Sequence, residues 1–228
     1  GLSIGAALGH GRLAIQGGEA NTQPRTSPEG RYVLIFNGEV YNSAELAHSL
    51  CQEWPFEGAT DTEALLAALA LEGERGLHRL NGMFAFVLFD TQTQTGWAAR
   101  DRLGVKPLLF EQTEGGLNLA SEAKALLAAR PPGRRAQLDL NAFADWVVAP
   151  QLSHRPKFQG LQQVPAGHLL RFGPQGVQLV EWASFVPQRR RVLQRPEARI
   201  LDELLRRVFM GVGRACEAEV PLGLFLSG

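Results

Sequence analysis

Short apolar runs, each bounded by turn-forming residues, dominate residues 1–180 and limit the fold to one built from strands and hairpins. We expect strands at residues 13–15, 32–36, 83–90, 96–100, 107–111 and 117–120, because Gly, Asn, Asp or Thr clusters separate these runs. Helices are expected between them at residues 44–51, 61–72 and 121–129. Strands that arrive as hairpins with helices interspersed favour antiparallel sheets covered by helices over a regular βαβ series. The predicted class is α+β.

A change of composition near the C-terminus predicts a second unit. Residues 187–196 carry four arginines between two prolines, which is typical of a solvated linker. Apolar residues then recur at helical spacing over 197–217, with Phe209 and Met210 as core candidates, and an apolar strand follows at 220–226. We therefore divide the chain into a domain at 1–185, a linker at 186–196 and the start of a second domain at 197–228. A chain that stops at the carboxyl end of such a strand is expected to be a fragment, because α/β sheets form their ligand crevice there.

Composition excludes several classes of function. The chain of 228 residues carries 23 Lys plus Arg and 23 Asp plus Glu, so no basic excess attracts nucleic acid or a membrane surface. Small molecules are the expected partners. Cys51 and Cys216 lie far apart and outside any metal-ligand spacing, which favours no metal site and a reducing, cytoplasmic location.

The segment at residues 36–42, Phe-Asn-Gly-Glu-Val-Tyr-Asn, places an Asn-Gly pair after an apolar run and a carboxylate directly after the pair. Asn-Gly suits the two positive φ angles of a type I′ turn, so the residues alone predict a hairpin turn at Asn37 and Gly38. Taken singly, this segment is most simply a turn.

Several segments together resemble the class II glutamine amidotransferase domain of asparagine synthetases. The matching segments follow in order at residues 9–15, 36–42, 58–63, 80–86, 99–108, 121–124 and 164–168, and residues 220–228 are similar to the entry of the synthetase domain. The resemblance implies an N-terminal nucleophile hydrolase-like αββα arrangement of antiparallel sheets and helices. It also implies that an α/β ATP-pyrophosphatase domain begins after the linker.

The resemblance also implies a set of site residues. The Asn37 side chain and the Gly38 N–H would form an oxyanion hole, Glu39 and Asp61 would bind the α-ammonium group of glutamine, and Arg12 would bind its α-carboxylate. Two further sets complete the expectation: Leu13, Ala14 and Ile15 at the glutamine site, and Leu226, Ser227 and Gly228 at the start of an ATP loop. Arg12, Glu39 and Asp61 each have a structural alternative, as a surface arginine, a solvent-facing strand residue and a helix N-cap.

The nucleophile that the resemblance implies is a cysteine at the mature N-terminus, activated by the free α-amino group. This chain begins with Gly1. We therefore expect the 228-residue polypeptide itself to hydrolyse no glutamine.

For the full-length protein, the resemblance implies an asparagine synthase that uses glutamine, ATP with Mg²⁺, and aspartate, and it allows a homodimer. An amide-forming enzyme that acts on another carboxylate, such as a β-lactam synthetase-like protein, is the first alternative. A non-catalytic regulatory domain is the second. A dinucleotide-binding or Walker-type protein is disfavoured because neither glycine motif is present.

Overall fold

Two antiparallel sheets form the centre of the protein. The computed structural model describes residues 5–11, 21–58, 60–150, 155–184, 196–216, 221 and 223. The large sheet has the order β1-β2-β3-β4-β8-β9, with bounds Arg25–Thr26, Tyr32–Val40, Gly82–Asp90, Thr95–Arg100, His168–Gly173 and Gly176–Glu181. The small sheet has the order β6-β5-β7, with bounds Gly116–Ala120, Leu109–Thr113 and Gln162–Gln163.

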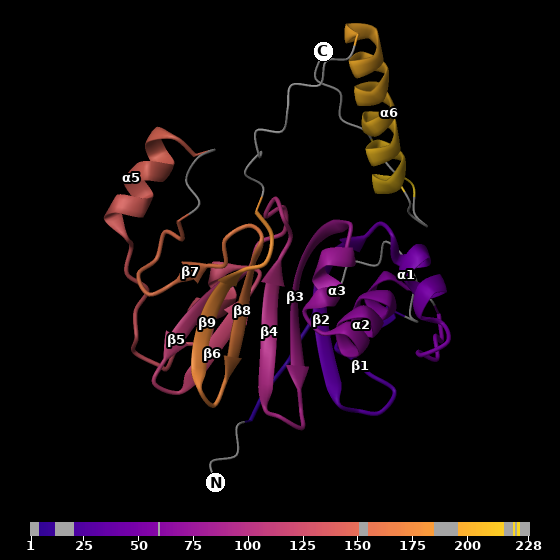
Figure 1. The fold of residues 1–228 in the computed structure, drawn as a ribbon. Coiled ribbons are helices and arrows are strands. Elements are labelled where there is room, and N and C mark those ends of the chain that lie inside the picture. The colour runs from indigo at the N-terminus through magenta and orange to yellow at the C-terminus, as the bar shows by residue number, and fades with distance from the viewer. Residues whose placement is uncertain are drawn as a thin grey trace.

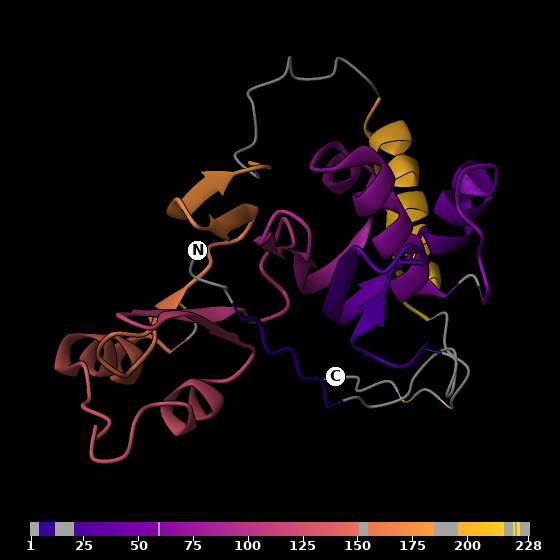
Figure 2. The same ribbon diagram turned by 90° about the horizontal axis from the view of Figure 1, so that it is seen from below.

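Six α-helices accompany the sheets in the described part of the chain. Their bounds are Ser43–Leu50 for α1, Asp61–Glu72 for α2, Arg75–Arg79 for α3, Ala123–Ala128 for α4, Leu140–Val148 for α5 and Glu197–Ala215 for α6. Figure 1 shows α1, α2 and α3 grouped beside one part of the large sheet, with β5, β6 and β7 at the other side of the molecule. The view from below in Figure 2 separates the same two groups. The predicted α+β class is confirmed.

The strand β3 explains how the layers hold together. Phe84 and Phe86 are buried in the cluster shared with α1, α2 and α3, whereas Ala85 and Val87 are buried in the cluster shared with β5. Successive side chains of a strand point to opposite faces, so one continuous apolar run supplies both cores. The helix α2 is buried along most of its length beneath this sheet, and its N-cap Thr60 accepts a hydrogen bond from the Glu63 N–H.

The predicted hairpin turn at Asn37 and Gly38 is wrong. Both residues lie inside β2, where they pair with Ala85 and Phe84 of β3. Glycine is required at position 38 for close approach: a Cβ atom there would lie 2.1 Å from the Met83 carbonyl oxygen, and the φ angle is +151°. The Asn-Gly pair therefore continues a strand rather than ending one.

Helix α6 also differs from expectation. Phe209 and Met210, predicted to be core residues, are 73% and 46% exposed. The reason is that, within the part of the chain that the structure describes, no layer of side chains buries the apolar face of α6. The predicted linker lies almost entirely in residues 185–195, outside the described residues, and the domain division stays a prediction.

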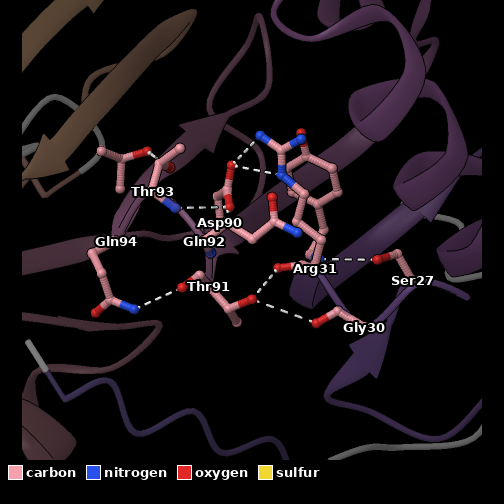
Figure 3. Close-up of polar contacts among 10 residues, drawn as sticks. Ser27, Gly30, Arg31, Asp90, Thr91, Gln92, Thr93 and Gln94 are labelled. Atoms are coloured by element: carbon pink, nitrogen blue, oxygen red, sulfur yellow. Dashed lines mark hydrogen bonds and ion pairs between the residues drawn. The ribbon is translucent and has the colours of Figure 1, made fainter.

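An ion pair closes the turn between β3 and β4, and Figure 3 shows its surroundings. Arg31 Nε and Nη2 donate to Asp90 Oδ2 at 3.0 and 2.7 Å, while the N–H groups of Gln92 and Thr93 donate to Oδ1 at 2.9 and 3.2 Å. These donors favour the ionised carboxylate, and they lower the pKa of Asp90 to about 2, with the Arg31 hydrogen bond as the largest cause. The turn is thus pinned to the beginning of β2.

This lowered pKa predicts a pH-dependent contribution to stability. Because the folded-state pKa lies below the ordinary value of 3.8, the stabilisation is complete above pH values near 4 and is lost as the pH falls toward 2. We expect Asp90→Asn to lower the thermal unfolding midpoint at pH 7 and 5, and the difference from the unsubstituted protein to shrink between pH 4 and 2. A difference that stays constant across this range would contradict the assigned role of the carboxylate charge.

Candidate functional site

A cleft of about 690 Å³ brings together the described site residues that the sequence predicted. Asn37, Gly38 and Glu39 reach it from β2, and Asp61 reaches it from the beginning of α2. Its remaining walls come from residues 9–11, from β3 and from the segment that joins β6 to α4. Polar groups distant in the sequence therefore share one concave surface, the usual setting of a small-molecule site.

The N–H of Gly38 faces the outer edge of β2. Phe84, its partner on β3, directs its backbone groups away from β2: its N–H donates to Asp101 Oδ2 at 3.1 Å, and its carbonyl accepts from the Asp101 N–H at 2.8 Å. Backbone groups in an antiparallel ladder alternate between the two neighbouring strands. The Gly38 N–H consequently points away from β3.

On both sides of Gly38, side chains form hydrogen bonds with the backbone at the outer edge of β2. The Gln23 side chain accepts from the Phe36 N–H at 2.6 Å and donates to its carbonyl at 3.0 Å. The Val40 N–H hydrogen-bonds to the Asp61 carboxylate. Strand β1 pairs only with Val33 and Leu34, so it does not cover the edge at Gly38. The glycine N–H thus lies where a ligand in the cleft could use it.

The Asn37 side chain is held by a residue from the far wall of the cleft. Its Nδ2 donates to Ser121 Oγ at 3.4 Å, and Ser121 also lines the cleft. An amide nitrogen carries two hydrogens, so one such bond still leaves a donor for a ligand. Ser121 belongs to the segment 121–124, which the sequence indicated as the beginning of a helix and as part of the family resemblance, with no binding role.

Asp61 is a buried carboxylate with several donors. Asn21 Nδ2 and the Thr62 N–H donate to its Oδ1 at 3.1 and 2.8 Å. Burial raises the pKa of Asp61, and the hydrogen bonds from Asn21, Thr62 and Val40 oppose that rise. Asp61 is the first residue of α2, where the helix dipole also favours a negative charge. The N-cap is Thr60, so the alternative that made Asp61 a capping residue does not describe it.

Glu39 adds a second negative group nearby. Burial is the largest cause that raises its pKa, and the charge of Asp61 raises it further, while Lys106 lowers it. Two carboxylates that line one cleft favour a cationic ligand, because a positive group between them offsets the negative charge that Asp61 places near Glu39. Among the described residues, no group of three or more His, Cys, Asp or Glu side chains is arranged to hold a metal ion.

The other predicted site residues lie outside the described residues. This applies to Arg12, Leu13, Ala14 and Ile15 at the glutamine site and to Leu226, Ser227 and Gly228 at the ATP loop. Their roles stay predictions. Gly9, His10 and Gly11, which directly precede Arg12, do line the cleft.

Lys106, Ser121 and Asn21 are among the cleft residues for which the sequence predicted no binding role. Lys106 and Ser121 lie in segments of the family resemblance, and Asn21 lies in none of them. Asn21 carries no sequence signal of its own, because it lies in a segment with no hydrophobic period. Only the fold places it beside Asp61.

Comparison with known proteins identifies the family. The family described as "Glutamine amidotransferase domain" matches residues 2–183. The chain belongs to this glutamine amidotransferase family. It is 34% identical to a "Putative asparagine synthetase [glutamine-hydrolyzing]" of Mycobacterium tuberculosis, a match that covers 100% of this chain and 36% of the relative. It is 31% identical to "Amidase chyE" of Penicillium rubens, covering 100% of this chain and 33% of that protein.

The fold agrees with the family. The structure of glutamine phosphoribosylpyrophosphate amidotransferase from B. subtilis superimposes with a TM-score of 0.51 at 20% identity, covering 73% of this chain and 33% of that one. This likeness supports the predicted N-terminal nucleophile hydrolase type of fold. The glutamine amidotransferase chain spans about a third of the length of the curated relatives reported above. No helix among its described residues is long and apolar enough to cross a membrane.

Proposed function

We propose that the cleft binds glutamine and supports its hydrolysis to glutamate and ammonia. The observation that carries this proposal is that Asn37, Gly38, Glu39 and Asp61 line one cleft in a chain of the glutamine amidotransferase family. A glutamine molecule has an α-ammonium group for the two carboxylates and a side-chain amide whose carbonyl becomes an oxyanion on attack. The cleft offers groups of the matching kinds.

Each residue then has a chemical task. Asp61 and Glu39 bind the α-ammonium group, and Arg12, expected from the resemblance, binds the α-carboxylate in bidentate geometry. Asn37 Nδ2 and the outward-facing Gly38 N–H donate to the oxyanion of the tetrahedral intermediate. Ser121 orients the Asn37 amide through the 3.4 Å hydrogen bond. The attacking group is the N-terminal cysteine of the resemblance, which is not among these 228 residues.

For the full-length protein we propose glutamine-dependent asparagine synthesis in the cytoplasm, with ATP, Mg²⁺ and aspartate as further reactants and a homodimer as the assembly. The relative named asparagine synthetase, 34% identical across the whole chain, supports this proposal. The second candidate is amide formation on another carboxylate. A relative with a different name, amidase, is 31% identical across the whole chain, so identity at this level does not single out asparagine synthesis. No residue described here distinguishes the acceptors.

The test is an assay of the complete gene product that contains this chain. The protein is incubated with ATP, Mg²⁺, glutamine and a panel of carboxylic acids, and the amide product is identified by mass spectrometry. Asparagine from aspartate is the expected result. An amide of a different acid would replace the first candidate with the second, and failure to release glutamate from glutamine under all conditions would refute both.

A further inference from the structure

Asn21 lies beside Asp61, and its side-chain oxygen has no hydrogen-bond donor among the described residues. Its side chain is 4% exposed, and its Nδ2 donates to Asp61 Oδ1 at 3.1 Å. An ionised carboxylate can only accept hydrogen bonds, so the amide nitrogen must face Asp61 and the amide oxygen must face elsewhere. That oxygen, Oδ1, is buried and meets no donor in the described part of the chain.

A buried amide oxygen without a donor is uncommon in a folded protein and requires an explanation. Asn21 lines the same cleft as Glu39 and Asp61, so a ligand is one source of the missing donor. The ligand group that fits is a cation with several N–H donors, because Asn21 contacts the Asp61 carboxylate and lines the same cleft as the Glu39 carboxylate. A primary ammonium group carries three such donors.

We propose that Asn21 is a further binding residue for the α-ammonium group of glutamine. Its Oδ1 accepts one N–H of the ammonium, Asp61 and Glu39 accept the other two, and its Nδ2 holds Asp61 in place. This inference rests on the proposed glutamine site and extends it by one residue. It also gives the cleft a specific requirement: ligands that lack an α-ammonium group leave Asn21 Oδ1 unpaired.

The test compares glutamine with glutaramate, which is glutamine without the α-amino group, in the complete protein. Asn21→Leu keeps a similar side-chain volume and removes both polar atoms. We expect kcat/KM for glutamine to fall about 10- to 100-fold, as for loss of a hydrogen bond to a charged group, while kcat/KM for glutaramate changes little. Equal losses with both substrates would overturn the proposal and make Asn21 a structural residue. Activity with added ammonia checks that the variant is folded. If Asn21→Leu does not fold, Asn21→Ala is used in its place.

A double-substitution cycle separates direct contact from an effect through Asp61. Asp61→Asn keeps the shape and the oxygen that accepts from Asn21 and Thr62, and should itself reduce the preference for glutamine over glutaramate. If Asn21 Oδ1 touches the ammonium, adding Asn21→Leu to Asp61→Asn lowers the preference again. No further change would mean that Asn21 acts only by positioning Asp61, which overturns the direct contact. If Asp61→Asn leaves the preference intact, the proposed glutamine site itself fails, and the two failures remain distinct.

Discussion

Asn37→Ala in the complete protein is expected to lower kcat for glutamine hydrolysis about 100- to 1,000-fold, the usual cost of removing one oxyanion-hole donor. The reason is that Asn37 Nδ2 faces the cleft and is held there by Ser121 Oγ at 3.4 Å. KM for glutamine should change much less, because the substrate carbonyl carries little charge before attack. The measurement is steady-state glutamate release over a range of glutamine concentrations.

The control for this prediction is activity with ammonia in place of glutamine, which bypasses the cleft and should be nearly unaffected by Asn37→Ala. Ser121→Ala serves as a matched variant: it leaves the Asn37 donor present but unanchored, so a smaller loss of kcat is expected. If Asn37→Ala reduces glutamine-dependent and ammonia-dependent activity equally, Asn37 supports folding rather than transition-state binding.

The class of the fold could be predicted because each core strand carries a local run of apolar residues. In the run at residues 83–90 every residue except Asp90 is apolar, so the side chains on both faces of the strand are suited to a core. The structure buries both faces of β3 accordingly. Strands β8 and β9 were missed because their residues are mixed in polarity: β9 is mostly exposed, and it pairs only with β8. Pairing between distant strands, such as β4 with β8, depends on the whole chain and leaves no local pattern.

The error at Asn37 and Gly38 has a physical cause. Asn-Gly is a strong turn signal because both residues tolerate positive φ angles, yet glycine is also required where another backbone approaches closely. At Gly38 the second reason holds, since a Cβ atom would meet the Met83 carbonyl oxygen and the Phe84 Cα at 2.1 and 2.7 Å. A sequence does not distinguish these two uses of glycine. The structure does: Gly38 lies within β2, and its N–H faces the outer edge of that strand.

The candidate site was accessible to sequence reasoning only through ordered motifs. Glu39 follows the Asn-Gly pair and Asp61 precedes an obvious helix, so both stand next to recognisable features. Asn21 and Ser121 act through side chains 40 and 84 residues away in the sequence. Contacts at such separations follow from the tertiary fold alone, which is why the residues that position Asp61 and Asn37 emerged only with the structure.

The buried carboxylate of Asp101 holds the backbone that follows β4. Asp101 is 1% exposed, and its two oxygens each accept two backbone N–H groups. The donors are Leu103 and Val105 to Oδ1, both at 3.0 Å, and Phe84 and Lys106 to Oδ2, both at 3.1 Å. Arg100, also buried, donates to the Lys106 and Val164 carbonyls at 2.6 and 3.0 Å. Charged side chains thus organise the backbone after β4.

Asp101→Ala is therefore expected to lower the free energy of unfolding by about 4 kcal/mol or more, because four backbone donors lose a charged acceptor whose residue is 1% exposed. Asp101→Asn should be intermediate, since its one remaining oxygen can serve only one pair of donors and its NH₂ group opposes the other. The exposed Asp145 offers a matched control, and Asp145→Asn should change the free energy by about 0.5 kcal/mol or less. Denaturant unfolding of the three variants, followed by circular dichroism, measures these differences. Similar small effects for Asp101→Ala and Asp145→Asn would mean that the turn after β4 keeps its shape without the buried carboxylate, and that β3, whose Phe84 N–H depends on it, is held by its ladder alone.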